Sequence, residues 1–271
     1  MSDTGRQGPT PRAKSASEAK SAKPVGRFAE YWDTLKTIVY AVVIALAVRT
    51  FAFEPFNIPS GSMIPTLLVG DYLFVAKYAY GYSRYSLPLD LPLFKGRILA
   101  SAPERGDVMV FRLPRDPSID YIKRIVGLPG DRIQVRGGVL YINDQEVKRE
   151  RIEDFVDNSF PAHPMRVPQY IETMPNGRRY RVLDLTPNGP HDNTRVYTVP
   201  PGDYFAMGDN RDNSSDSRVD PAVGGVGFIP AANLIGPAKL IFYSTSGGAR
   251  LWQPWKWWGA TRFGRIFDLV E

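Results

Sequence analysis

The hydrophobic pattern divides the chain into an apolar N-terminal run and a long remainder of short alternating segments. The run TIVYAVVIALAV, residues 37–48, carries no charge. It is shorter than the roughly 20 residues that cross a bilayer, but a helix counted over residues 35–53 reaches about 28 Å. Arg49 can extend to the far interface beside aromatic anchors. We therefore expect an uncleaved transmembrane signal anchor at 35–53, with a buried core helix and a cleaved signal peptide as alternatives.

Beyond Pro55 the pattern changes from helical to strand-like. Gly-Asp pairs recur along this region, and several of them open short apolar runs, which indicates turns followed by strands. The pair Gly137-Gly138 separates two such runs and is typical of a two-residue hairpin loop. Residues 54–271 are therefore expected to form a mainly β, antiparallel domain. Its strands are expected at 71–80, 107–112, 131–136, 139–142, 179–185, 194–199, 203–207 and 234–244.

Two regions lack this pattern. Residues 1–26 hold too little apolar side chain to fold, so we expect a disordered basic tail over residues 1–34. Residues 1–36 contain seven basic and four acidic side chains, which predicts a cytoplasmic N-terminus and an exported remainder. The segment 146–200 is rich in Pro, Asn and Arg, and we interpret it as an insertion or second lobe of the β domain.

Composition narrows the chemistry that the chain can perform. The sequence has no Cys and only two His, which excludes a thiol protease, a disulfide framework, a zinc ribbon and a three-His metal site. A hydrolase of this composition would use Ser, Lys, Asp, Glu or Tyr for proton transfer. We expect neither a metal nor another cofactor.

The net charge of +6 is spread over side chains of both signs without a Lys/Arg-dense stretch, so nucleic acid is not an expected partner. A membrane surface is favoured instead. Four of the five Trp residues lie close together near the C-terminus among basic residues, which is typical of a membrane interface, although a core role for one or two of them is an alternative. This cluster comprises Trp252, Trp255, Trp257 and Trp258, with Lys256, Arg262 and Arg265.

Two motifs could carry a nucleophile and its base. In PSGSMIPTLLVGD, Gly61 permits a tight turn that would expose Ser62, although an ordinary turn between helix and strand is the alternative. In the run 121–126, strand alternation places Lys123 on an apolar face. Such a lysine either protects a sheet edge from aggregation, or is a desolvated amine whose lowered pKa suits a general base.

A third motif is the polar loop 207–218, MGDNRDNSSDSR. It could be a solvated loop, or a calcium loop formed by Asp209, Asp212 and Asp216. Its acidic spacing does not match the positions that an EF-hand calcium loop requires.

Taken in order, SGSMIPT, YIKR and GDNRDNSSDSR resemble the motifs of bacterial type I signal peptidases, over residues 35–243. The resemblance implies a membrane-bound serine endopeptidase that removes signal peptides through an acyl-enzyme. It implies that Ser62 is the nucleophile and Lys123 the general base. Ser60 would join the Ser62 backbone N–H in an oxyanion hole, and Ser214 would orient the lysine amine.

The same resemblance implies cleavage after Ala-X-Ala, with the substrate extended between residues 56–60 and 120–122. The partners would be exported preproteins and membrane lipid, at the bacterial inner membrane with the catalytic domain on the periplasmic side. Four residues would support the site: Arg124, Asp209, Asp216 and Arg218. Seven would bind substrate: Phe56, Ile58, Pro59, Met63, Leu67, Tyr121 and Ile122.

Other functions remain possible from the residues alone. One is a related Ser/Lys protease, either a pilus-processing peptidase or a LexA-like self-cleaving repressor, which would need a DNA-binding helix-turn-helix where this chain has its anchor. Another is a non-enzymatic, membrane-anchored β domain that binds calcium or partners.

Overall fold

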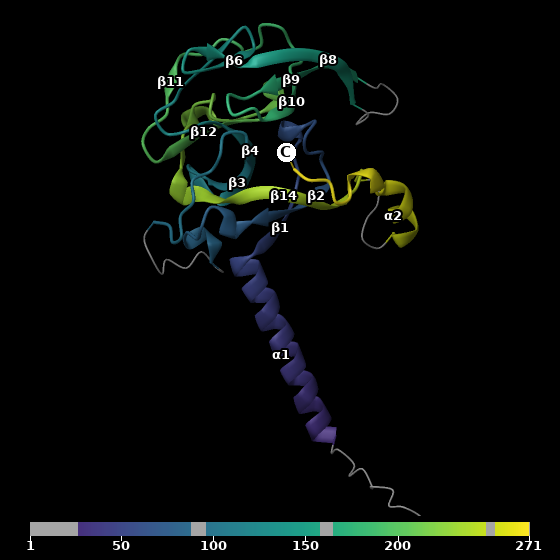
Figure 1. Ribbon diagram of the computed structural model, residues 1–271. Helices are drawn as coiled ribbons and strands as arrows, with labels where there is room; N and C mark the ends of the chain where they lie inside the picture. The colour runs from purple at the N-terminus through teal and green to yellow at the C-terminus, as the bar shows by residue number, and fades with distance from the viewer. Residues whose placement is uncertain (1–26, 88–95, 158–164, 248–252, 271) are drawn as a thin grey trace, which may run out of the picture. The chain divides into compact units, whose positions relative to one another are not determined.

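A computed structural model describes residues 27–87, 96–157, 165–247 and 253–270 of the chain (Figure 1). The chain forms two compact units, Met1–Ile44 and Ala45–Glu271. The disorder predicted for residues 1–26 falls outside the described residues.

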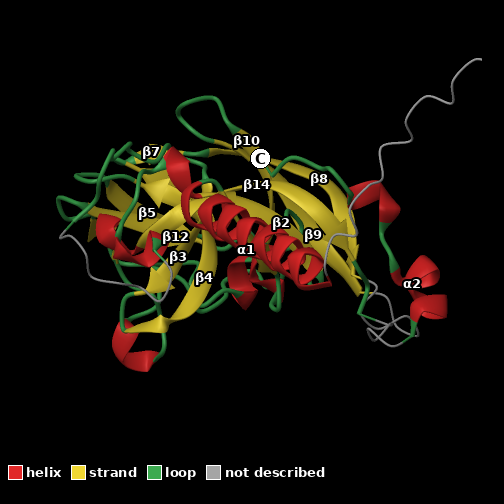
Figure 2. Ribbon diagram, turned by 90° about the horizontal axis from the view of Figure 1, so that it is seen from below, coloured by secondary structure: helices red, strands yellow, loops and turns green. Residues whose placement is uncertain are grey.

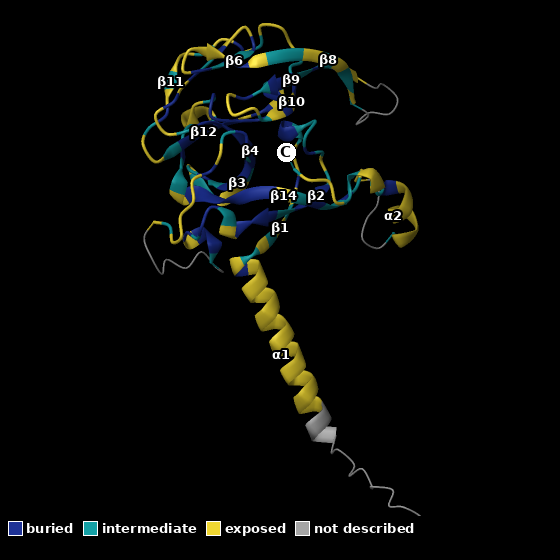
Figure 3. Ribbon diagram, viewed as in Figure 1, coloured by how far each residue is buried: buried dark blue, intermediate teal, exposed yellow. Residues whose placement is uncertain are grey.

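The helix α1 (Arg27–Phe51) contains the segment Tyr31–Phe51, which is long and apolar enough to span a membrane. Side chains 31–49 are exposed along the helix (Figure 3). The helix begins inside the predicted tail, because charged residues such as Asp33 and Lys36, which form an ion pair three positions apart, support it beyond the uncharged run. It ends before Phe53, which belongs to a strand, so the predicted bounds of 35–53 were displaced toward the C-terminus.

Strands are the main regular structure of the second unit (Figure 2), and within the described residues each pairing of one strand with another is antiparallel. The predicted mainly β, antiparallel fold with an N-terminal apolar helix is thus confirmed. The largest sheet has the order β1-β2-β14-β3-β4-β12-β13. Its strands are β1 (Phe53–Asn57), β2 (Asp71–Ala76), β14 (Leu234–Ser244), β3 (Val108–Leu113), β4 (Asp116–Gly127), β12 (Asp203–Met207) and β13 (Ile229–Pro230).

Two smaller sheets complete the unit. One has the order β10 (Arg179–Leu183), β9 (Met165–Thr173), β8 (Lys148–Asp157), and the other has the order β11 (Tyr197–Thr198), β5 (Arg132–Arg136), β6 (Val139–Ile142), β7 (Gln145–Glu146). The hairpin between β5 and β6 is as predicted, with positive φ angles of 53° and 78° at its two glycines. A short helix, α2 (Pro254–Ala260), lies near the C-terminus.

The segment 146–200 is more regular than its sequence predicted. Strands β8 and β9 pair over most of their length. The pattern hid β8 because its sequence, KRERIEDFVD, is mostly charged and largely without buried side chains. Some predicted strands are shorter than expected: 71–80 ends at Ala76, 179–185 ends at Leu183, and only Tyr197–Thr198 of 194–199 is a strand.

Strand β4 lies in the middle of the core. Its residues Ile122, Ile125 and Val126 each belong to a different cluster of buried apolar side chains. It pairs with β3 on one side and with β12 on the other. Residues 122–127 of this strand are all buried, so a polar side chain in this part of β4 is held among apolar neighbours.

Candidate active site

A single 3-10 turn, Gly61–Met63, presents the predicted nucleophile. It follows β1, and Ser60 precedes it in extended backbone. The Ser62 side chain is largely buried, at 8 % exposure of the residue. Asn210, from the polar loop 207–218, holds this turn with two hydrogen bonds. Its backbone N–H donates to Ser62 O at 3.1 Å, and its Nδ2 donates to Gly61 O at 3.0 Å.

Lys123 reaches Ser62 from the centre of the sheet. Its Nζ lies 2.6 Å from Ser62 Oγ and 3.0 Å from the carbonyl oxygen of Ile122, with both contacts made as hydrogen bonds. The residue is only 3 % exposed, and the Tyr121 ring lies 5.3 Å from Nζ. The alternative of a lysine that protects a sheet edge from aggregation is wrong, because the side chain is buried and its amine binds Ser62 instead of facing solvent.

Burial changes the proton affinity of this amine. Desolvation lowers the pKa of Lys123 from 10.5 to about 8, against the attraction of Asp216 and Asp209 and with a smaller contribution from Arg218. A lysine with this pKa is partly neutral near physiological pH, and the neutral amine can accept a proton from a neighbouring hydroxyl.

The four predicted supporting residues form two buried ion pairs. Arg124 donates from Nε and Nη2 to the two carboxylate oxygens of Asp209, at 2.8 Å each. Arg218 donates in the same way to Asp216, at 2.9 Å each. Asp216 also accepts from the backbone N–H of Gly208 at 3.0 Å.

The calcium alternative needs three carboxylates as ligands, and two of them, Asp209 and Asp216, are already paired with arginines. The third, Asp212, lies with Asp184 and Asp192 in an acidic cluster. Its Oδ2 accepts hydrogen bonds from the backbone N–H groups of Leu185 and Thr186. The loop is thus organised by arginines and backbone amides.

Ser214 lies in the same loop, but it does not make the contact with the lysine amine that was expected of it. Among the described residues no hydrogen bond joins Ser214 to Lys123; its hydroxyl instead helps to lower the pKa of Asp216. The loop packs so closely that a Cβ on Gly208 would lie 2.2 Å from Ser214 Oγ and 2.5 Å from Ser62 O. The glycine therefore allows Ser214 to approach the nucleophile.

A cavity of about 460 Å³ opens beside Ser62 and Lys123. The residues that line it come from β1 and the turn after it, from β3 and β4, and from the loop, and they include Ser60, which is exposed. Five of the seven predicted substrate residues line it: Phe56, Ile58, Pro59, Tyr121 and Ile122.

Met63 and Leu67, the other two, do not. Both have 0 % exposure and pack in an apolar cluster with Ile58 and Ile122. They support the cavity wall from behind and cannot touch a substrate, so their prediction as contact residues was wrong. An apolar residue beside a nucleophile can point to the cavity or to the core, and the sequence pattern does not distinguish the two.

Several lining residues were not among those predicted: Asn57, Val110, Ile119, Asp120, Asn213 and Ser215. For four of these residues, their position in the sequence next to a predicted site residue could have indicated them. Asn57 and Asp120 fall within the two strands expected to flank a substrate, and Asn213 and Ser215 flank Ser214 in the loop. Val110 is placed by its pairing with Ile122 across β3 and β4, which no local pattern reveals.

The two strands beside the cavity offer unpaired edges. Within the described part of the chain, β1 pairs only with β2, and residues 119–122 of β4 pair only with β3. An extended peptide can add to such edges through backbone hydrogen bonds, while its alternate side chains enter pockets.

A serine hydrogen-bonded to a buried lysine, beside a peptide-sized cavity with strand edges, is typical of the serine proteases that use a lysine base. The family described as signal peptidase, peptidase S26, matches residues 31–243. The chain belongs to this family, and it is a serine endopeptidase. This assignment excludes the non-enzymatic alternative.

Individual relatives agree with the family. The signal peptidase I of Rickettsia typhi is 45 % identical over 217 residues, which cover 77 % of this chain and 79 % of that protein. The signal peptidase I of Rickettsia massiliae is 46 % identical over 77 % of this chain and 78 % of that protein. A crystal structure of a signal peptidase I from Enterococcus faecalis matches with 26 % identity and a TM-score of 0.31, over 51 % of this chain and 97 % of that one.

Proposed function

We propose that Ser62 and Lys123 form the catalytic dyad with which this serine peptidase removes signal peptides from exported preproteins. The observation that carries the proposal is the 2.6 Å hydrogen bond between Lys123 Nζ and Ser62 Oγ, made by a buried lysine at the wall of the cavity. The family assignment supports the removal of signal peptides as the reaction, and this contact supports the roles of Ser62 as nucleophile and Lys123 as base.

The reaction would proceed in two stages. Lys123 takes the hydroxyl proton while Ser62 Oγ attacks the scissile carbonyl carbon, and the proton then passes to the leaving amine. The acyl-enzyme ester on Ser62 is next hydrolysed by a water that Lys123 deprotonates. The negative charge on the carbonyl oxygen would be stabilised by the Ser60 hydroxyl and the Ser62 backbone N–H.

The cavity also supports a preference for small residues. A peptide extended along β1 and β4 would direct every second side chain to the same face. The residues upstream of the bond at the first and third positions would therefore enter the cavity together. Its apolar wall, which includes Phe56, Ile58 and Ile122, would accept the two alanines of Ala-X-Ala and exclude larger side chains.

The direct test is cleavage of a preprotein with an Ala-X-Ala site by the purified full-length protein in detergent. Mass spectrometry of the products should place the cut after the second alanine. Absence of cleavage, or cleavage elsewhere, would contradict the proposal.

The Ser60→Ala variant tests the oxyanion hole. Loss of one such donor is expected to lower kcat by about 10²–10³-fold with a much smaller change in KM, because the donor acts on charge that develops in the transition state. Ser118→Ala is a suitable control, since that exposed serine lies on β4 but outside the cavity. If Ser60→Ala raises KM and leaves kcat unchanged, Ser60 binds substrate and is not an oxyanion donor.

We also propose that α1 anchors the enzyme in the bacterial inner membrane, with the chain before Tyr31 in the cytoplasm and the β domain in the periplasm. The segment Tyr31–Phe51, about 32 Å long, is sufficient to span the hydrocarbon layer. The excess of basic residues before it favours this orientation.

The C-terminal segment is a second candidate for lipid contact. Trp255 and Trp258 on α2 are 72 % and 80 % exposed, and Phe263 and Phe267 beyond it are exposed as well. Exposed indole rings on a basic segment favour the membrane interface. Trp252, the first of the predicted cluster, lies outside the described residues.

Reporter fusions test the orientation. Alkaline phosphatase fused after Gly70 is expected to be active, because it folds only after export, and a fluorescent protein of cytoplasmic type fused there is expected to stay dark. The reverse pattern would overturn the proposed topology.

A further inference from the structure

We propose that Glu172 and Tyr180, which belong to the three-stranded sheet and to none of the catalytic motifs, are positioning residues that hold the loop 208–218 against Ser62 and Lys123. The inference rests on the dyad proposed above and assigns a role to the lobe 146–200. Neither residue touches the cavity.

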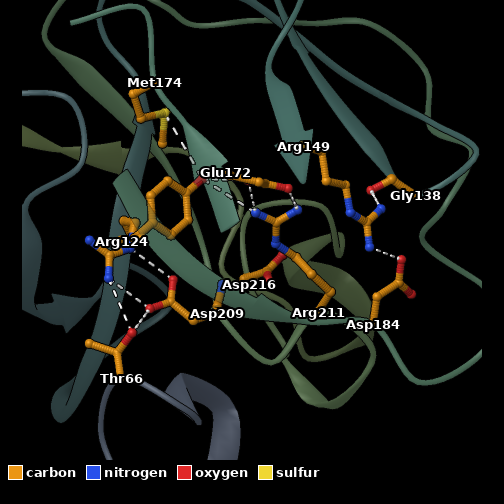
Figure 4. A network of polar contacts seen from close by, with 12 residues as sticks. Thr66, Arg124, Gly138, Arg149, Glu172, Met174, Asp184, Asp209, Arg211 and Asp216 are labelled. Carbon is orange, nitrogen blue, oxygen red and sulfur yellow. Dashed lines mark hydrogen bonds and ion pairs between the residues drawn. The ribbon is translucent and has the colours of Figure 1, made fainter. Parts of the chain in front are cut away.

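Glu172 is the centre of a buried polar network (Figure 4). It lies on β9 with 0 % exposure. Arg211 donates to its two carboxylate oxygens at 2.9 and 2.5 Å, and Tyr180 OH donates to it at 2.6 Å. Burial opposes ionisation of Glu172, but Arg211 prevails and keeps the pKa of the carboxyl below its usual value.

Arg211 belongs to the loop 208–218, so its ion pair with Glu172 attaches this loop to the three-stranded sheet. It begins the 3-10 turn Arg211–Asn213, immediately before Ser214. Its carbonyl oxygen accepts a hydrogen bond from Arg218 at 2.5 Å, and Arg218 in turn pairs with Asp216. The preceding residue, Asn210, holds the Ser62 turn through its two hydrogen bonds. This ion pair joins backbone contacts such as Leu183 N–H to Asp209 O in holding the loop to the lobe, and it is the side-chain attachment next to the residue that holds the Ser62 turn.

Tyr180 links the same network to the strand that carries the base. The guanidinium carbon of Arg124 lies 4.3 Å from the Tyr180 ring centroid, in a cation–π contact. Arg124 follows Lys123 on β4 and binds Asp209 of the loop. Tyr180 therefore contacts the loop attachment through its hydroxyl and the base strand through its ring.

The loop supplies the charged groups that face Lys123. These are Asp216 and Asp209, which favour the protonated amine, and Arg218, which disfavours it; from β4 itself the Tyr121 ring lies nearest. Burial has the largest effect on Lys123, and it depends on close packing of the loop. A loosened loop would admit water to the amine and raise its pKa toward the ordinary value.

Glu172→Gln tests the proposal because it keeps the size of the side chain and removes the charge that holds Arg211. We expect the acidic limb of kcat/KM against pH to move upward by about one unit, with an approximately tenfold lower rate at pH 7 that recovers at high pH. Tyr180→Phe should shift the limb in the same direction by a smaller amount. A role in stability alone would lower the melting temperature without moving the limb.

Arg105→Gln is the matched control. Its partner is Asp131, and the two side chains are 13 % and 11 % exposed, but the pair makes no hydrogen bond or ion pair with the loop 208–218 among the described residues. This variant should unfold at a lower temperature with an unmoved pH profile.

The outcomes separate the two proposals. If the wild-type enzyme does not cleave the precursor, the dyad function fails. If the wild type cleaves, and folded Glu172→Gln and Tyr180→Phe keep its pH profile, only the positioning role is overturned. Should Glu172→Gln fail to fold, Tyr180→Phe decides alone, because loss of one hydroxyl leaves the ion pair between Glu172 and Arg211 in place.

Discussion

Replacement of Ser62 by Ala is expected to abolish cleavage of an Ala-X-Ala precursor, with a fall in kcat of at least about 10⁴-fold. The change removes the only atom that can form the acyl-enzyme in the proposed mechanism. Lys123, whose Nζ lies 2.6 Å from Oγ, serves as the base and not as the nucleophile in this mechanism. Any residual rate would come from the oxyanion hole and substrate binding alone.

The measurement is single-turnover cleavage in detergent, followed by gel mobility and mass spectrometry. Ser83→Ala is the matched control, because Ser83 is also a buried serine with a hydrogen-bonded hydroxyl, but it caps a 3-10 turn away from the cavity. That variant should lose some stability and keep the wild-type rate. Full activity of a folded Ser62→Ala enzyme would refute the assignment of the nucleophile.

The sequence predicted the members of the site better than their contacts. Lys123 was singled out because alternation along a strand placed a charge on an apolar face, and the structure shows it buried there. Its contact with Ser62, which is 61 residues away, depends on how β1 and β4 pack around a shared core. Sequence spacing carries no information on that packing, so only the resemblance to a family brought the two residues together before the structure did.

Glu172 is a residue whose buried position the sequence could not predict. It is a single acidic residue in a weakly patterned segment, and most acidic residues in such segments are solvated. Its burial follows from two partners, one 8 and one 39 residues away in sequence. Of the two strands that carry Glu172 and Tyr180, the sequence pattern predicted β10 at 179–185 but not β9, so it could not place the two side chains side by side.

The start of α1 was missed for a related reason. Hydropathy identifies the segment that a membrane would cover, but a helix continues as long as its backbone is favoured. Side chains such as Lys36, which pairs with Asp33 at 3.2 Å, support the helix outside the apolar run. The apolar run and the helix therefore have different bounds.

Replacement of Lys123 by Met is the second change with a large expected effect. The variant keeps the apolar stem and removes the amine, so Ser62 loses its base, and kcat should fall by at least about 10³-fold. The wild-type enzyme should show the corresponding pH dependence. A base acts in its deprotonated form, and burial lowers the pKa of Lys123 to about 8. Its rate should therefore rise about tenfold per pH unit below pH 8 and level off above it.

Rates measured from pH 6 to 10 for the wild type, Lys123→Met and Lys77→Met would test this assignment. Lys77 is the matched control, since it is equally buried at 3 % exposure but binds Glu54 at 2.9 Å and the carbonyl oxygen of Arg49. Its loss should lower the melting temperature and leave the midpoint of the pH profile near 8, because it does not contact Ser62. A Lys123→Met enzyme whose rate still rises through pH 8 would show that another group is the base.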